Sequence, residues 1–177
     1  MALTPDPQAT LAELHRYAIS EVLGLVEGLY ENIEDGLFEL ADRGSGSQRQ
    51  ERCFNLMREL RFRRTCLVRN FTGSMQSLEG YWFVDESWSV KPSAFGDELG
   101  VRMLDITNKS DQHFTGLLRL IAERSSHATN LGSKRLNELP IGPWAISQAF
   151  VQSCRSLSMD PESIDLVFNL FSRFVLE

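Results

Sequence analysis

Histidine is the residue that most often acts as a general base near neutral pH, and this chain has three: His15, His113 and His127. His15 falls on the apolar side of an expected helix, where a packed ring is favoured over a catalytic one. No cysteine or acidic residue stands four positions beyond His113 or His127. The motifs typical of nucleotide-binding and hydrolytic enzymes are also missing. The sequence therefore predicts a protein that is not an enzyme, with no catalytic residue, metal site or cofactor.

The chain also has three cysteines, Cys53, Cys66 and Cys154, a residue type that can form disulfides or bind zinc. Their number is odd, and they stand in no Cys-x-x-Cys pair and no cysteine–histidine cluster. We therefore predict that all three are small apolar core residues.

Charge is distributed unevenly along the chain. Residues 1–46 contain nine acidic residues and two arginines, a net charge of −7. Residues 49–69 contain seven arginines and two glutamates, a net charge of +5, and Arg61, Arg63 and Arg64 surround one phenylalanine. Such a run could bind phosphate groups or RNA. At helical spacing, however, the seven arginines scatter around the helix, so a solvated surface against an acidic helix is the favoured interpretation.

Arg64 falls near the middle of the apolar side of its expected helix. A buried guanidinium without a carboxylate or carbonyl partner costs several kcal/mol, so Arg64 should have such a partner or line a binding cleft. Glu21 and Glu39 flank the apolar stripe of the first helix and are the expected partners. The other acids of that helix are expected to point away from the second helix: Glu13, Glu27, Glu31, Glu34 and Asp42.

The outward acids predict a negative surface in which Phe38 is embedded. An exposed phenylalanine on an acidic helix can anchor a protein partner. The candidate partner-binding residues are therefore Phe38, Glu31, Glu34 and Asp35. The three arginines of the Arg-Phe-Arg-Arg run are the candidate phosphate- or nucleic-acid-binding residues.

Apolar residues recur every three or four positions through most of the chain, which predicts an all-α protein. One stripe covers residues 8–42 and a second covers 48–78, with a Gly-Ser-Gly-Ser turn between them. Two long helices joined by so short a turn predict an antiparallel hairpin. Gly24 and Gly28 interrupt the first helix, so we expect a neighbouring backbone close to them or, alternatively, a kink.

The periodicity lapses after residue 78. Residues 79–96 form an expected aromatic-rich connection, with a short helix around residues 85–89. A third helix is expected over residues 97–126. Its polar stretch 107–112 leaves a break in that helix as an open alternative.

Two further helices are expected near the C-terminal end. Pro143 opens one of them, and Asp160-Pro161-Glu162 supplies a cap, a first-turn proline and a first-turn acid for the other. The prediction is a helical bundle in which the long hairpin, residues 1–78, packs with a smaller helical layer, residues 79–177, as one domain. Since the last helix reaches Glu177 without a stop signal, we expect the natural protein to continue.

Composition limits the class of protein. The chain has 177 residues, of which 42% are hydrophobic and 24% charged, as in an ordinary globular domain. The net charge of −6 favours solubility and disfavours general nucleic-acid binding. No apolar stretch is long enough to span a membrane, and no secretory signal precedes the first helix. We therefore expect a cytoplasmic protein without a membrane partner.

Several segments resemble the N-terminal part of a large family of unknown function, found mainly in proteobacteria and often labelled "thymidine phosphorylase" in genomes. The residues that carry this resemblance are Asn32–Arg43, Met57–Arg64, Val84–Glu86, Leu139–Pro143, Phe150, Phe168, Phe171, Val175 and Leu176. The resemblance implies the helical N-terminal region of a considerably longer protein and supplies no catalytic residues. Gly36 and the turn at residues 44–47 depart from it. No glycine-rich phosphate loop supports the phosphorylase label.

The sequence favours a helical scaffold or regulatory module that binds a protein partner. The alternatives are a module that binds RNA or nucleotide phosphates through the second helix, and an accessory domain of a larger enzyme. A homo-oligomer is also left open.

Overall fold

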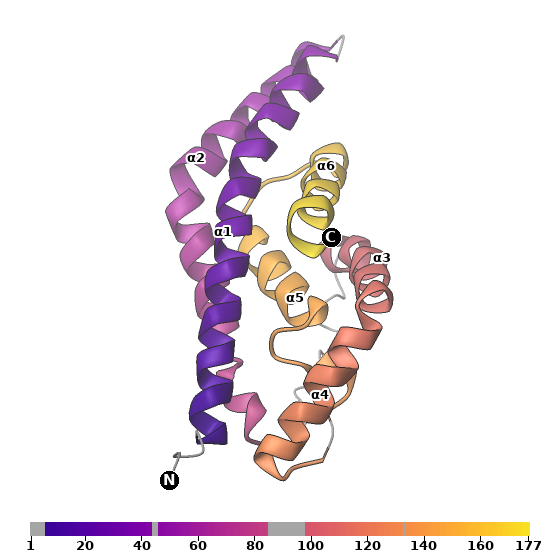
Figure 1. Ribbon diagram of the computed structural model, residues 1–177. Helices are drawn as coiled ribbons and strands as arrows, with labels where there is room; N and C mark the ends of the chain where they lie inside the picture. Colours follow the sequence, from indigo (N-terminus) through magenta and orange to yellow (C-terminus); the bar gives the residue numbers. More distant parts are fainter. Residues whose placement is uncertain (1–5, 44–45, 85–97, 133) are drawn as a thin grey trace.

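The computed structural model describes residues 6–43, 46–84, 98–132 and 134–177, which form six α-helices and no strand (Figure 1). The prediction of an all-α helical bundle is therefore confirmed. Two short 3₁₀ turns, Glu79–Trp82 (η1) and Leu136–Glu138 (η3), and a π-helical turn, Ser172–Leu176 (η4), accompany the helices. None of the described helices has both the length and the apolar character needed to cross a membrane.

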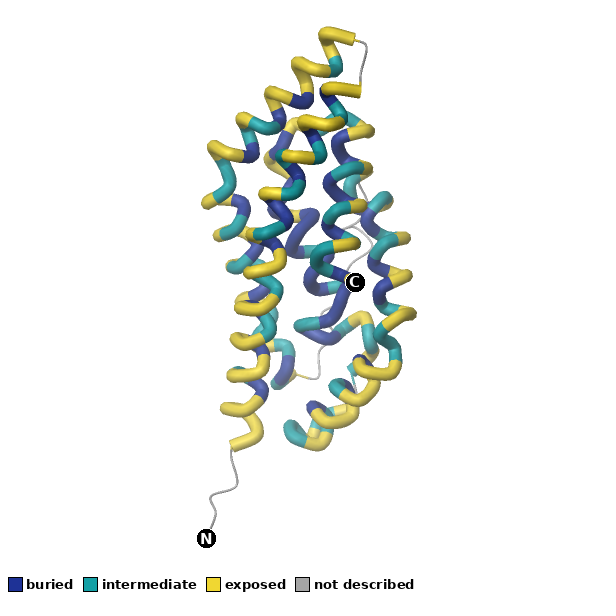
Figure 2. Tube along the Cα trace, turned by 45° about the horizontal axis from the view of Figure 1, so that its top comes forward, coloured by how far each residue is buried: buried dark blue, intermediate teal, exposed yellow. Residues whose placement is uncertain are grey.

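The two longest helices, α1 (Pro7–Asp42) and α2 (Ser47–Gln76), run antiparallel along one side of the molecule (Figure 1). Asp6 caps α1 because its carboxylate accepts a 3.1 Å hydrogen bond from the backbone N–H of Gln8. Apolar residues at three-and-four spacing become the buried side of each helix (Figure 2). The expected long hairpin is therefore present, with its second helix ending two residues earlier than predicted.

Four shorter helices lie beside this hairpin: α3 (Glu98–His113), α4 (Thr115–Thr129), α5 (Pro143–Cys154) and α6 (Pro161–Phe171). Helix α5 packs against α2 and α3, and α6 packs against α1 (Figure 1). In the core between them, the rings of Phe150 and Phe171 stack 4.0 Å apart and 9° from parallel. The hairpin therefore shares one apolar core with the shorter helices.

Helix α6 begins where its sequence predicts. The Asp160 carboxylate accepts hydrogen bonds of 3.1 Å from the backbone N–H groups of Glu162 and Ser163. Helix α6 then approaches α1 so closely that a Cβ atom at Gly36 would lie 3.2 Å from a methyl group of Leu166. Gly36 is thus explained by close helix packing, although glycine is a poor helix former.

The single third helix expected over residues 97–126 is wrong, because the chain bends at Phe114 and forms α3 and α4. The bend lies just beyond the polar stretch 107–112, where a break in the helix was the alternative prediction. The Thr115 hydroxyl donates to the backbone carbonyls of Asp111 and Gln112, at 2.8 and 3.0 Å. Such side-chain donation competes with the helical ladder and favours a bend.

The expected close neighbour of Gly24 and Gly28 is not found among the described residues. A Cβ atom added to either glycine would meet no other atom within 4 Å. Helix α1 continues through both positions without interruption. The short helix expected around residues 85–89 lies outside the described residues.

The prediction for the cysteines is correct at two positions and wrong at one. Cys53 and Cys154 are buried, and burial raises the pKa of both thiols, that of Cys154 to about 12. Cys66 is exposed on α2, because it lies on the side of that helix that faces away from the core.

His15 connects the start of the hairpin to its end. Its ring is fully buried, with Nε2 at 2.9 Å from the backbone carbonyl of Met75 and Nδ1 at 3.2 Å from the indole nitrogen of Trp82. A carbonyl can only accept and an indole N–H can only donate, so Nε2 carries the proton and Nδ1 accepts. The expected packing role of His15 is therefore confirmed.

Replacing His15 with alanine should destabilise the protein by about 2–4 kcal/mol, because it leaves a cavity and removes the acceptor of the buried Trp82 N–H. Urea unfolding followed by circular dichroism measures the loss. Glu13→Ala, an exposed change two residues away, is the matched control and should stay within about 0.5 kcal/mol of the wild type. Equal midpoints for the two variants would contradict this role.

Asp111 of α3 is a partly buried carboxylate whose Oδ1 has no hydrogen-bond partner within the described residues. Burial raises its pKa above the usual 3.8, and a hydrogen bond with Trp144 offsets part of that rise. Between the unfolded and the folded pKa, the folded state binds more protons than the unfolded state. The stability that this group contributes is therefore present at low pH and is lost as the pH rises through the folded pKa.

The wild type should accordingly gain stability relative to Asp111→Asn as the pH falls from about 7 to about 4, since only the wild type takes up this proton. The measurement is the difference in unfolding free energy between the two proteins at several pH values. A difference that stays constant, or that moves the other way, would show that Asp111 is not the titrating group.

Candidate interaction surface on the helical hairpin

Arg61 joins the two long helices through an ion pair. Its Nε donates to Oε2 of Glu34 at 2.7 Å. The Glu34 side chain is only 21% exposed, so this carboxylate lies beside α2 and does not point away from it as expected. Glu34 lies beside α2 because it stands opposite Arg61. Which residues of α1 and α2 stand opposite each other is decided only when the two helices pack.

Arg64 forms the second link between the helices. Its Nη2 donates to the backbone carbonyl of Glu27 at 3.0 Å and to Oε1 of Glu31 at 3.4 Å. The expected partners were wrong: Glu39 pairs with Arg43 four residues away, and Arg64 bonds to Glu27 and Glu31, not to Glu21. Since the Arg64 side chain is 37% exposed, no buried cleft is needed to accommodate its charge.

Arg63 points to the other side of α2. Its Nη1 donates to the backbone carbonyl of Ser156 at 2.8 Å, and its Nε lies 3.4 Å from the Glu59 carboxylate. Arg63 therefore ties α2 to the segment between α5 and α6. The Arg-Phe-Arg-Arg run consequently does not present its three guanidinium groups on one surface, and each already has an intramolecular partner.

The exposed side of α1 carries what we call the acidic stripe. Its members follow one another at intervals of three or four residues, so they share one side of the helix: Glu27, Glu31, Asp35, Phe38 and Asp42. All five are exposed, and Phe38 is 57% exposed. Three of the four expected partner-binding residues thus lie on one surface, and the fourth, Glu34, borders it.

The exposed side of α2 carries a second set that the sequence analysis missed, which we call the basic–aromatic stripe. It has the same helical spacing and consists of Phe54, Arg58, Phe62, Thr65 and Arg69. Phe62 is 91% exposed and Phe54 is 40% exposed. Comparing the exposed sides of the two helices could have found this stripe, because its spacing is visible in the sequence.

The two stripes meet at a contact between aromatic rings. Phe38 and Phe54 approach edge to face, with centroids 6.5 Å apart and ring planes at 64°. Within the part of the chain that the structure describes, neither Arg58 nor Arg69 forms an ion pair. The face therefore combines exposed aromatic rings, uncommitted cations and a row of carboxylates.

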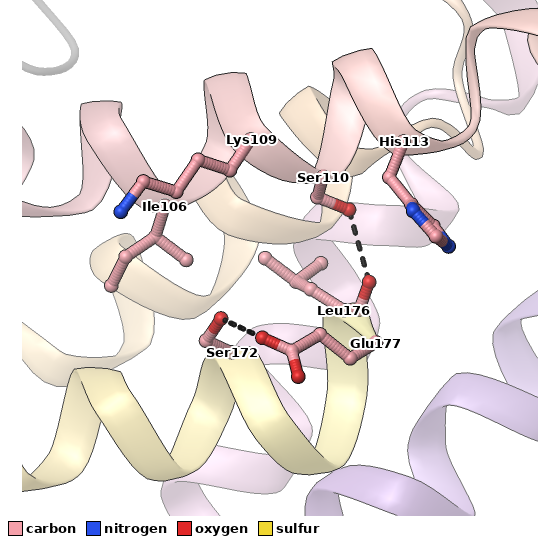
Figure 3. Close-up of a pocket in the computed structure, with 7 residues that line it drawn as sticks. All are labelled: Ile106, Lys109, Ser110, His113, Ser172, Leu176 and Glu177. Atoms are coloured by element: carbon pink, nitrogen blue, oxygen red, sulfur yellow. Dashed lines mark hydrogen bonds between the residues drawn. The ribbon is translucent and has the colours of Figure 1, made fainter.

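A pocket of about 360 Å³ lies at the other end of the chain, between α3 and η4 (Figure 3). Its hydroxyl groups are committed: Ser110 donates to the Leu176 carbonyl at 3.0 Å, and Ser172 donates to the Glu177 carboxylate at 3.1 Å. Lys109 and His113 lie at opposite ends of the pocket (Figure 3). No activated nucleophile is assembled here, and the described residues contain no cluster of three metal-ligand side chains.

The chain matches no protein-family model, no curated protein and no solved structure. No residue role can be transferred from a relative, so the hairpin face itself is the evidence for function.

The arginines of α2 should separate into two classes in a stability measurement. Arg64→Ala should cost about 1 kcal/mol, because it removes the hydrogen bond to the Glu27 carbonyl. Arg58→Ala should change stability by less than about 0.5 kcal/mol, because Arg58 is exposed and forms no ion pair with another described residue. Chemical denaturation of both variants tests this, and equal losses would mean that Arg58 has a structural partner.

Proposed function

We propose that this protein is a non-enzymatic scaffold or regulatory module that binds a protein partner through the exposed face of its helical hairpin. The central binding residues are Phe38 and Asp35, joined by Phe54. Glu31 and Glu34 border them, and each already pairs with an arginine of α2. The observation that carries this proposal is the exposed pair of aromatic rings, because Phe38 is 57% and Phe54 40% exposed while they contact each other.

Burial of this pair by a partner would remove a large apolar area from water. A fully buried aromatic residue covers about 150–250 Å², and because Phe38 and Phe54 are 57% and 40% exposed, about half of that area remains for a partner to cover, at about 25 cal/mol per Å². A compact aromatic centre bordered by charged residues has the usual anatomy of a protein-binding site. The hairpin also presents the rings on two helices that are packed together, so little ordering is needed on binding.

Binding of RNA or nucleotide phosphates through Arg61, Arg63 and Arg64 is the weaker proposal. Each of these arginines already bonds to a carboxylate, and two also bond to a backbone carbonyl. A phosphate would have to displace those partners. The role of an accessory domain in a larger enzyme has no specific observation in its favour.

Phe38→Ser should reduce capture of the partner from a cell extract by at least about tenfold, because truncation of a central aromatic residue typically costs 2 kcal/mol or more. Captured proteins are compared quantitatively by mass spectrometry, with and without nuclease. Leu120→Ser, which changes a half-exposed apolar residue of α4, is the matched control and should leave capture unchanged.

Two results would count against this function. One is an unchanged set of captured proteins with Phe38→Ser although the variant is folded by circular dichroism. The other is loss of every partner on nuclease treatment, which would favour the RNA-binding alternative.

A further inference from the structure

We propose that the hairpin face binds a second copy of this chain, so that α1 of each copy lies over α2 of the other. This inference rests on the proposed function, because it identifies the partner of the same face. The acidic stripe and the basic–aromatic stripe are opposite in charge and lie side by side. One face thus holds both halves of a complementary pair.

The charges on this face are largely uncommitted. Among the described residues, no ion pair forms at Glu27, Asp35 and Asp42 of α1, or at Arg58 and Arg69 of α2. All five are exposed. These charges are therefore available to a facing molecule that places basic residues over α1 and acidic residues over α2.

Symmetry selects one arrangement of two copies. A two-fold axis parallel to the hairpin exchanges the two helices, so α1 faces α2 of the second copy and opposite charges meet. A two-fold axis across the hairpin would instead place α1 on α1 and bring like charges together. Like charges that face each other are unfavourable, so the parallel axis is preferred.

The pairing of α1 with α2 also sets the levels of these residues. Because Arg61 pairs with Glu34 and Arg64 with Glu31, each residue further along α2 lies level with one earlier in α1. Asp35 is therefore within one helical turn of the level of Arg58, and Glu27 is within one turn of the level of Arg69. A two-fold axis parallel to the helices preserves these levels between copies.

The aromatic rings follow the same rule. Phe38 and Phe54 are at one level because they contact each other. In the proposed pair, the two rings of each copy would meet the two rings of the other and form a cluster of four. The rings would supply apolar burial, and the flanking charges would fix which helix faces which.

The expected affinity is modest. Each copy contributes two stripes of five residues, whereas a stable interface usually has about 20–30 residues a side. We expect a dissociation constant on the order of 10 µM or weaker, which should weaken further in salt because the charges are exposed.

The first measurement is sedimentation equilibrium of the purified chain from about 5 to about 500 µM, at about 50 mM and about 500 mM salt. A monomer–dimer equilibrium that weakens at high salt is expected. A chain that stays monomeric over the whole range at low salt would overturn the proposal.

Two charge-reversal variants then test the arrangement. Glu27→Lys with Asp35→Lys places lysines near the levels of Arg69 and Arg58, and Arg58→Glu with Arg69→Glu places glutamates near the levels of Asp35 and Glu27. Each variant alone should self-associate at least about tenfold more weakly than the wild type, because like charges now face each other. An equimolar mixture should form a heterodimer, since the introduced lysines of one variant then face the introduced glutamates of the other.

The matched controls change the same charges on the shorter helices. Asp105→Lys with Glu123→Lys, and Arg119→Glu with Arg124→Glu, alter exposed residues of α3 and α4 and should leave dimerisation unchanged. Equal weakening by controls and test variants would overturn the proposal, and so would a mixture that fails to associate. A monomeric chain that still captures a partner through Phe38 would refute only the self-association.

Discussion

The structure depends above all on the packing of two long amphipathic helices against each other and against the shorter helices. Leu29, Ile33 and Leu37 of α1, and Leu60 and Leu67 of α2, are at most 3% exposed. Burial of side chains of this size contributes about 1.5–3 kcal/mol each, far more than an exposed ion pair. Apolar contact therefore decides how the helices face one another, and the charged residues take the positions that remain.

The ion pairs of the hairpin have a different role from the core. Arg61–Glu34 and Arg64–Glu31 are at least partly solvated, and such pairs contribute little to the free energy of folding. Their effect is to neutralise particular arginines and acids, while others, such as Arg58 and Asp35, form no ion pair within the described ranges. Two buried hydrogen bonds, from His15 to Met75 and from Trp82 to His15, join the start of α1 to the end of α2 and the turn that follows it.

Much of the fold follows from local patterns. The three-and-four spacing of apolar residues marks α1 and α2, and Asp160 with Pro161 marks the start of α6. The bend at Phe114 was harder to place, because it depends on a single hydroxyl, that of Thr115, which donates to nearby carbonyls. For the candidate site, the spacing of Phe38 among acids was informative, whereas the exposed rings of Phe54 and Phe62 were overlooked although their spacing is equally regular.

The sequence by itself determined which residues form helices and which side of each helix is apolar, because both depend on neighbours within one or two turns. Only the tertiary structure decided that Arg64 bonds to Glu31, that Cys66 is exposed and that Phe38 meets Phe54. These outcomes depend on the level at which two helices pair and on where a third helix covers them. That level is set by many apolar contacts between residues distant in the sequence, so no single segment specifies it.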